Sequence, residues 1–241
     1  MKIALIGYGK MGKAIEQVIL EEGRHEIVLK ITEFNKADFN SENLRNVDVA
    51  IDFTEPDSAY DNVMLCFKAN VPIVVGTTSW PEGLEKAKKF CLENNQTLFT
   101  SPNFSIGVNL FFQLNKQLTR LMMPFNNYSV KMSEIHHTEK KDAPSGTAIQ
   151  LANDMIAVSN NQYKSWELTK ESKTGVIPIE AIREEHVPGT HHVRFESDID
   201  FIQITHEAKG RKGFAVGAVR AAEYIYGKKG YFTMDDLLYF N

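Results

Sequence analysis

The residues best suited to chemistry lie together between Glu134 and Thr147, where two histidines, two lysines, an aspartate and a Ser-Gly-Thr turn follow one another closely. Burying so many polar groups without partners would be costly, so the segment is expected to be a loop. Lysines and histidines can donate protons, and a Ser-Gly-Thr turn that opens a helix directs free backbone N–H groups toward an anion. Apolar spacing from Ala148 to Ile156 predicts that helix. The segment indicates an anion-binding, proton-delivering loop; the alternative is a solvated charged loop without a ligand.

A second motif, Gly7-Tyr8-Gly9-Lys10-Met11-Gly12, follows the apolar run Ile3–Ile6 and precedes helical spacing that begins at Ala14. In this context the first glycine permits a tight turn, the second a close approach of pyrophosphate, and the third close helix–strand packing. Glu33 follows Gly12 by about 20 residues, the distance at which an acid accepts hydrogen bonds from ribose hydroxyls. The motif predicts dinucleotide binding, and the alternative is three turn glycines without a ligand.

Two later loops are expected to face the same crevice, because they follow further predicted strands of the same sheet. They are Gly76-Thr77-Thr78 and Ser101-Pro102-Asn103-Phe104. Their small and hydroxyl-bearing residues can approach a nicotinamide and its ribose. The alternative is that both are ordinary polar turns.

The first hundred residues alternate between strand and helix patterns, which predicts a parallel, doubly wound α/β sheet. Strands are expected at Ile3–Ile6, Ile27–Ile31, Asp48–Phe53, Pro72–Val75 and Thr97–Thr100. After Asn103 the pattern changes to a long helix, a strand that leads into the histidine loop, the loop's helix, and strands at 176–182, 193–195 and 199–204. We interpret this part as a second, α+β domain. The helix expected at Phe214–Tyr226 should pack on the first domain.

Composition narrows the classes of partner. With 43% hydrophobic and 24% charged residues and a net charge of −4, the chain is typical of soluble globular proteins and has no basic excess for nucleic acid. Its apolar runs are too short for a membrane span, and Ile3–Ile6 is too short for the core of a signal peptide. Cys66 and Cys91 are expected to be small apolar fillers in a reducing cytoplasm, and no spacing indicates a metal site.

Five segments occur in an order similar to that of the 4-hydroxy-tetrahydrodipicolinate reductases (dihydrodipicolinate reductases) of bacterial lysine and diaminopimelate biosynthesis. They are His136–Ala148, Ile51–Thr54, Val75–Thr78, Asn103–Asn109 and Phe214–Val219. The resemblance covers essentially the whole chain. It implies a Rossmann-type domain from residues 1–105 and 212–241, with the C-terminal helices completing its sheet. A central domain, 106–211, would carry an open mixed sheet, bind the substrate and form a homotetramer.

The resemblance also implies roles for individual residues. His136 matches the catalytic acid/base histidine, and Lys140 matches the lysine that donates a proton. His137 and the turn Ser145, Gly146 and Thr147 match groups that hold the substrate's carboxylates. The positions that match the cofactor site are Gly7, Tyr8, Gly9, Lys10, Met11, Gly12, Glu33, Gly76, Thr77, Thr78, Ser101, Pro102, Asn103, Phe104, Arg211 and Phe214.

The implied reaction removes a hydroxyl as water and reduces the resulting conjugated double bond with hydride from NADH or NADPH. Neighbouring cations in the histidine loop are expected to make its proton donor more acidic. Many relatives have arginine where this chain has Lys10, and many NADP-using relatives have arginine where it has Phe34, so two guanidinium groups suited to a 2′-phosphate are missing. Lys10 and Lys36 remain as point charges. NADH is therefore expected to serve at least as well as NADPH.

Two other functions are open on the residues alone. One is a different nicotinamide-dependent enzyme, such as an amino-acid or imine dehydrogenase; the other is a module that senses dinucleotide without turnover. The complete histidine-loop motif favours the reductase over both. The remaining histidines, His186, His191, His192 and His206, are expected at the surface or in structural roles.

Overall fold

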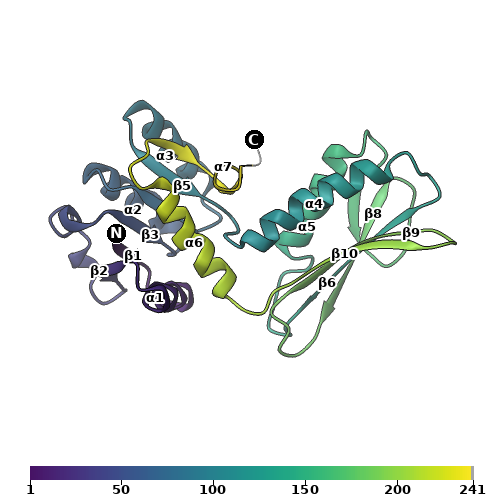
Figure 1. The fold of residues 1–241 in the computed structure, drawn as a ribbon, viewed down its shortest axis with the longest axis horizontal. Helices are drawn as coiled ribbons and strands as arrows, with labels where there is room; N and C mark the ends of the chain where they lie inside the picture. Colours follow the sequence, from purple (N-terminus) through teal and green to yellow (C-terminus); the bar gives the residue numbers. More distant parts are fainter. Residues whose placement is uncertain (240–241) are drawn as a thin grey trace. The chain divides into compact units, whose positions relative to one another are not determined.

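The computed structural model describes residues 1–239, which divide into two compact units (Figure 1). Unit 1 combines Met1–Ile106 with the chain from Arg211 onward, and unit 2 is the continuous segment Gly107–Gly210. Unit 1 is therefore built from both ends of the chain.

The sheet of unit 1 is entirely parallel, in the order β11-β5-β4-β3-β1-β2. Its strands are β1 (Lys2–Ile6), β2 (Glu26–Ile31), β3 (Val49–Asp52), β4 (Ile73–Val75), β5 (Thr97–Thr100) and β11 (Gly230–Phe232). Strand order reverses at β1, and ligands of such sheets bind beyond the carboxyl ends of the strands at this point. The predicted doubly wound sheet is confirmed.

Helices cover both faces of this sheet, as the near-continuous burial of its inner strands requires. They are α1 (Lys10–Glu22), α2 (Pro56–Lys68), α3 (Pro81–Glu93), α6 (Lys212–Ile225) and α7 (Met234–Leu237), with short 3₁₀ turns at Lys36–Asp38 and Asn43–Asn46. Helices α1 and α6 share one apolar core with the sheet, and α2 and α3 share the other. Both α2 and α3 begin with proline, whose fixed φ suits a first helical turn.

Helix α6 packs closely because small residues form its buried face. Ala215, Ala218, Ala221 and Ala222 are fully buried, and Gly217 lies directly against the backbone of Phe104. Helix α6 therefore completes the core of the first unit, as the sequence predicted.

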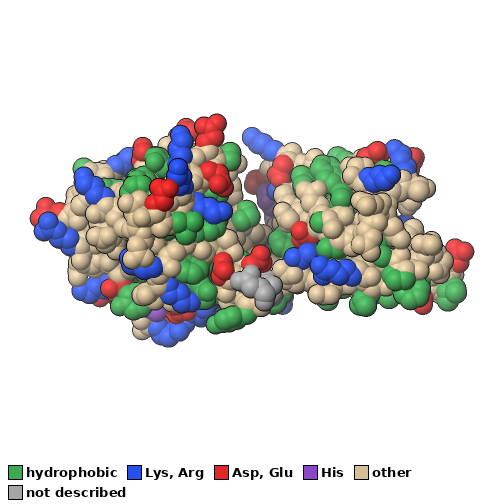
Figure 2. Space-filling model, turned by 90° about the horizontal axis from the view of Figure 1, so that it is seen from above, with side chains coloured by type: hydrophobic (Ala, Val, Ile, Leu, Met, Phe, Trp, Pro, Cys, Tyr) green, Lys and Arg blue, Asp and Glu red, His purple; other side chains and the backbone are tan. Residues whose placement is uncertain are grey.

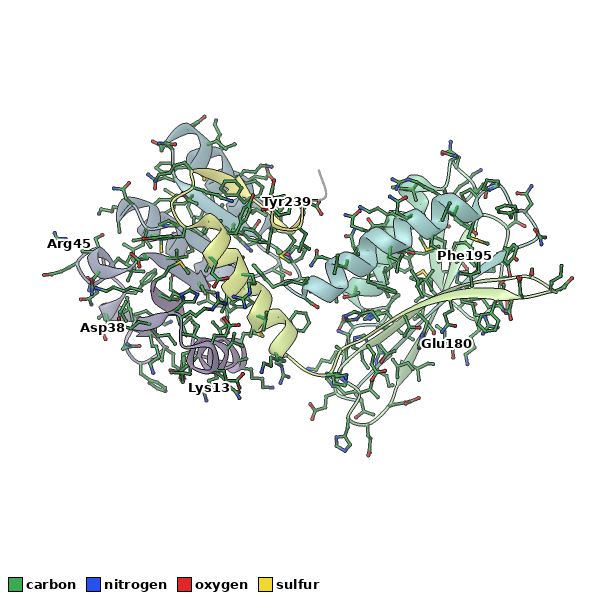
Figure 3. The ribbon with its side chains drawn as sticks, in the orientation of Figure 1. Lys13, Asp38, Arg45, Glu180, Phe195 and Tyr239 are labelled. Carbon is green, nitrogen blue, oxygen red and sulfur yellow. The ribbon has the colours of Figure 1, made fainter. Side chains whose placement is uncertain are left out.

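Unit 2 has a mixed sheet in the order β10-β9-β6-β8-β7. Its elements are α4 (Ile106–Met122), β6 (Ser129–His136), α5 (Gly146–Val158), β7 (Ser165–Leu168), β8 (Val176–Arg183), β9 (Thr190–Glu196) and β10 (Phe201–Glu207). Strand β6 runs parallel to β8 and antiparallel to β9. One face of the sheet packs on α4 and α5, with Phe195 of β9 in that core (Figure 3). The predicted open mixed sheet is confirmed.

The sequence did not predict three short elements: β7, β11 and α7. Both strands are edge strands of three or four residues and are partly exposed, so they lack a readable apolar alternation. Strand β10 starts at Phe201 and not at Ile199, because Ser197–Asp200 closes a turn through a backbone hydrogen bond of 2.9 Å.

Charged side chains of both signs are mixed over the face of each unit shown in Figure 2. Within the described residues, no helix is both long and apolar enough to cross a membrane. Cys66 and Cys91 are buried free thiols, in agreement with the prediction that they fill apolar space.

Replacing Gly217 with alanine tests the close approach of α6. The added methyl group would lie 1.7 Å from the carbonyl oxygen of Phe104. Gly217→Ala should lower the free energy of unfolding by about 1–3 kcal/mol or more, the usual cost of overpacking. The control is Gly213→Ala on the same helix, whose methyl group would make an ordinary contact at 3.6 Å. Equal stabilities of the two variants in urea denaturation would contradict this account of the packing.

Candidate active site

The histidine loop connects the end of β6 to the start of α5, at one edge of the sheet of unit 2. Strand β8 ends beside it at Arg183, and the antiparallel strand β9 begins beside it at Thr190. Residues from all three strands and the helix therefore meet at this edge.

Glu134 and His136 lie on the same face of β6 as the core residues Val130 and Met132, because side chains alternate along a strand. Glu134 is fully buried, and its Oε2 lies 2.6 Å from Nδ1 of His136. The two atoms form an ion pair by distance, without the alignment of a full hydrogen bond. A methyl group at Gly189 would lie 2.9 Å from Nε2 of His136, so the ring is packed on its other side as well.

His191 is buried beside His136, with the two rings 5.1 Å apart. Its Nε2 lies 3.1 Å from the hydroxyl of Ser145. Burial, with a further contribution from the charge of His136, lowers the pKa of His191 to about 3. We expected His191 at the surface or in a structural role. The structure places it against His136 and Ser145, and the sequence could not predict these contacts because residue spacing does not reveal that β9 pairs with β6.

Lys140 is half-buried, and its amino group contacts both carboxylate oxygens of Asp142 at 2.8 and 2.9 Å. The lysine holds the pKa of Asp142 below its ordinary value. The sequence led us to expect cationic neighbours around the proton donor, whereas the amino group of Lys140 contacts an acid. A backbone hydrogen bond of 3.1 Å from Lys140 N to His137 O forms a turn, and Asp142 follows within reach of the amino group of Lys140. Lys141 is exposed.

Ser145 caps the first turn of α5, because its hydroxyl accepts a hydrogen bond from Ala148 N at 3.2 Å. Gly146 is exposed, and a methyl group added there would meet no other part of the described chain within 4 Å. Thr147 is half-buried beside it. The predicted anion-binding turn is therefore an open helix start with first-turn N–H groups free of intrahelical partners.

The glycine motif of unit 1 has the geometry that a dinucleotide needs. A methyl group on Gly7 would lie 2.4 Å from the carbonyl oxygen of Phe53, and one on Gly12 would lie 2.4 Å from that of Gly7. Gly9 is different, because no described atom beyond its own chain neighbours lies within 4 Å of an added methyl group. Packing therefore requires glycine at Gly7 and Gly12, whereas Gly9 leaves open space before α1. This arrangement fits a bound pyrophosphate.

The loops after β3 and β4 are held by Asp52, a buried carboxylate at the end of β3. It accepts hydrogen bonds from Thr54 at 2.7 and 2.9 Å, Asn62 at 2.9 Å and Thr77 at 3.3 Å. Burial raises its pKa, although these donors act in the opposite direction. The hydroxyl of Thr77 thus faces Asp52, and Thr78 is the exposed residue of its loop.

In the loop after β5, the hydroxyl of Ser101 bonds to the backbone of Asn103. Pro102 is exposed, whereas the ring of Phe104 is buried and lies 5.6 Å from that of Phe53. The side chain of Phe104 therefore belongs to the core.

The remaining predicted cofactor residues border the glycine motif or begin α6. Glu33 is exposed, and Phe34 beside it is 90% exposed. Lys10 and Lys36 are exposed, Tyr8 and Met11 are half-buried, and the hydroxyl of Tyr8 contacts Glu16. Arg211 is exposed at the start of α6, and Phe214 is half-buried.

Glu134, His136 and His191 also offer three metal-ligand atoms within 4.8 Å of one another. The 2.6 Å between Glu134 Oε2 and His136 Nδ1 is shorter than the roughly 3 Å that separates two ligands of one zinc ion at about 2.0–2.1 Å. Arg183 also contacts the carboxylate at 3.2 Å. This geometry favours an ion-pair cluster over a metal site.

Sequence reasoning missed Glu134, Arg183 and His191. Glu134 opens the quoted segment, but an acid in a strand carries no signal of its own. Arg183 and His191 come from distant strands, and only the pairing of β8 and β9 with β6 brings them to the loop.

Comparison with known proteins agrees with this arrangement. The family models for the N-terminus and the C-terminus of dihydrodipicolinate reductase match residues 1–104 and 107–238. The chain is similar to the 4-hydroxy-tetrahydrodipicolinate reductase of Christiangramia forsetii, with 48% identity over 240 residues, 99% of this chain and 98% of that one. The Staphylococcus aureus enzyme of the same name is 35% identical over 247 residues, covering 98% of this chain and all of that one. A dipicolinate-bound dihydrodipicolinate reductase from Paenisporosarcina sp. TG-14 shares the fold, with a TM-score of 0.77, 24% identity, and coverage of 98% and 99%.

The fold and the glycine motif define an oxidoreductase that uses a nicotinamide cofactor. The chain belongs to the dihydrodipicolinate reductase family. Membership confirms the reductase activity in lysine and diaminopimelate biosynthesis that the sequence predicted, in place of the dehydrogenase and sensor alternatives.

The neutral state of buried His191 should make stability depend on pH. Between its pKa of about 3 in the folded protein and its ordinary 6.5, the unfolded chain binds a proton that the folded chain excludes, so stability should rise with pH. His191→Gln should flatten that slope by at most about 1.4 kcal/mol per pH unit. Urea denaturation across this range measures it, with His192→Gln on the same strand as the control. An unchanged slope in His191→Gln would refute the assignment.

Proposed function

We propose that His136 and Lys140 handle the protons of the reductase reaction, in which 4-hydroxy-tetrahydrodipicolinate loses water and is reduced to tetrahydrodipicolinate. The observation that supports this proposal is the convergence of a buried, ion-paired histidine and a half-buried lysine on the loop that opens α5. Both residue types can deliver a proton to a carbon that becomes carbanion-like.

We propose that the substrate's two carboxylates bind His137 and the turn Ser145, Gly146 and Thr147. The open helix start at Gly146 supports this, because first-turn N–H groups and the helix dipole favour an anion. The dipicolinate bound by the Paenisporosarcina protein is a planar dicarboxylate and offers the same chemistry. Unit 2, close to the predicted 106–211, would then be the substrate-binding part.

We propose that unit 1 binds the nicotinamide cofactor, which supplies hydride when bound. The open space at Gly9 supports a pyrophosphate there, and exposed Glu33 suits a ribose diol. The other proposed contacts are Gly7, Tyr8, Lys10, Met11, Gly12, Gly76, Thr77, Thr78, Ser101, Pro102, Asn103, the backbone of Phe104, Arg211 and Phe214.

Single substitutions in the loop test the proton roles. Lys140→Ala and His136→Ala should each lower kcat by on the order of a hundredfold or more, as is typical for loss of a general acid. The dissociation constant of NADH, measured by fluorescence titration, should stay near that of the unchanged protein because unit 1 is untouched. The control is Lys131→Ala on the same strand as His136, which removes only an exposed ion pair with Glu196. Unchanged kcat in both loop variants would show that the loop takes no part in proton transfer.

We propose that NADH serves at least as well as NADPH. A 2′-phosphate carries close to two negative charges and would lie near Glu33, while Phe34 offers no cation in return. Lys10 and Lys36 are both exposed, and an exposed lysine contact is typically worth about 1 kcal/mol or less.

The ratio of kcat/KM for NADH and NADPH at fixed ionic strength tests this proposal. Phe34→Arg should shift the ratio toward NADPH, with Phe34→Leu as the uncharged control. A preference of the unchanged protein for NADPH above tenfold, about 1.4 kcal/mol, would mean that the lysines outweigh Glu33.

We also propose a cytoplasmic homotetramer. The edge strand β10 supports the assembly, because it leaves Phe201 and Ile202 exposed at the border of the mixed sheet. Light scattering coupled to size-exclusion chromatography should give four times the 27.3 kDa chain mass, whereas Phe201→Lys with Ile202→Lys should reduce the mass. A monomeric unchanged protein would contradict the proposal.

A further inference from the structure

One fully buried carboxylate, that of Glu134, contacts three separate elements of unit 2. Its Oε2 lies 2.6 Å from Nδ1 of His136 on its own strand. Its Oε1 accepts a hydrogen bond from the backbone N–H of Ser145 at 3.1 Å, at the start of α5. The same oxygen lies 3.2 Å from Nη2 of Arg183 at the end of β8. Both ends of the histidine loop are therefore bound to this side chain.

Arg183 extends these contacts to the middle of the loop. Its Nη2 donates to the carbonyl oxygen of Asp142 at 2.7 Å, and its Nε donates to that of Lys140 at 3.4 Å. The guanidinium thus neutralises Glu134 and holds the backbone from which the side chain of Lys140 extends.

The carboxylate is negatively charged despite its burial. Burial alone would raise the pKa of Glu134, but the contacts with His136, Ser145 and Arg183 outweigh it and hold the pKa at about 2. The charged and titratable groups that face it from its own strand, β8, β9 and the loop are His136, Arg183, His191, Lys140 and Asp142.

We propose that Glu134 is a positioning residue for the reductase reaction: its carboxylate orients the ring of His136 and, with Arg183 and Ser145, holds the loop that carries Lys140. The proposal rests on the roles of His136 and Lys140 given above.

An anion beside Nδ1 has two effects on an imidazole. It favours the tautomer that carries its proton on Nδ1, which leaves Nε2 as the atom that exchanges a proton. It also stabilises the imidazolium form relative to the neutral ring. Glu134 would therefore govern both the direction and the charge of the acid/base group, whereas its contacts with Ser145 and Arg183 govern the shape of the loop.

Glu134→Gln separates charge from shape, because glutamine keeps an oxygen for Ser145 N–H but removes the negative charge. We expect kcat to fall roughly tenfold or more, as misplaced catalytic groups cost, with the KM for NADH unchanged. The pH profile of kcat/KM should change as well, because the negative charge beside the acid/base group is lost. Glu134→Asp keeps the charge and should restore the pH profile even if kcat stays reduced.

The control is Glu196→Gln on β9, which removes ion pairs with Lys131 and Arg194 from the same sheet away from the loop. It should retain the kcat and the pH profile of the unchanged protein. If Glu134→Gln does not fold, as judged by circular dichroism, Arg183→Gln decides. Arg183 is half-buried, and Arg183→Gln should both lower kcat and raise the inhibition constant of dipicolinate.

Unchanged kcat and pH profile in a folded Glu134→Gln, or unchanged kinetics in Arg183→Gln when Glu134→Gln is unfolded, would overturn the proposal. The control for the underlying assignment is His136→Ala. If kcat is strongly reduced in His136→Ala but unchanged in Glu134→Gln, only the positioning role fails. If His136→Ala is itself normal, the proposed proton chemistry fails first.

Discussion

A carboxylate buried without partners costs several kilocalories per mole, so the fold around one is constrained to bring partners to it. Glu134 is met by a ring on its own strand, a guanidinium at the end of β8 and a backbone N–H at the start of α5. These partners come from segments almost fifty residues apart in the chain. Strand pairing and helix placement in unit 2 must therefore be correct before the charge is compensated, and the loop between β6 and α5 takes its shape from the same contacts.

Unit 1 also contains a buried carboxylate that fixes loops, but its pKa is shifted in the opposite direction. Asp52 ends β3 and binds the loops after β3 and β4 through Thr54, Asn62 and Thr77, all of them neutral donors. Burial therefore prevails and raises the pKa of Asp52, whereas the cationic partners of Glu134 lower its pKa to about 2. Each unit thus fixes its loops with a buried acid. Neutral donors leave the pKa of Asp52 raised, whereas partners that include a guanidinium lower the pKa of Glu134.

Local patterns were enough to predict most of this architecture. The alternation of buried strands and amphipathic helices indicated the parallel sheet, and the spacing of Gly7, Gly9 and Gly12 indicated a turn whose close contacts the structure contains. Edge strands β7 and β11 were not predictable, because three or four half-exposed residues carry no periodicity. Arg183 and His191 were not linked to the histidine loop for a different reason: both are distant from it in sequence, and contacts across the sheet depend on a strand register that spacing does not encode.

The division of unit 1 between the two ends of the chain has a consequence for synthesis on the ribosome. Residues 1–106 supply five of the six strands of its sheet, but α6 and β11 are translated only after residue 210. The continuous unit 2 can thus finish folding while the first sheet still lacks a helix on one face and a strand beside β5. Until α6 emerges, apolar residues of that face such as Val74 and Phe99 stay uncovered, so the nascent chain has an exposed apolar face that favours aggregation until residues 212–225 have been made.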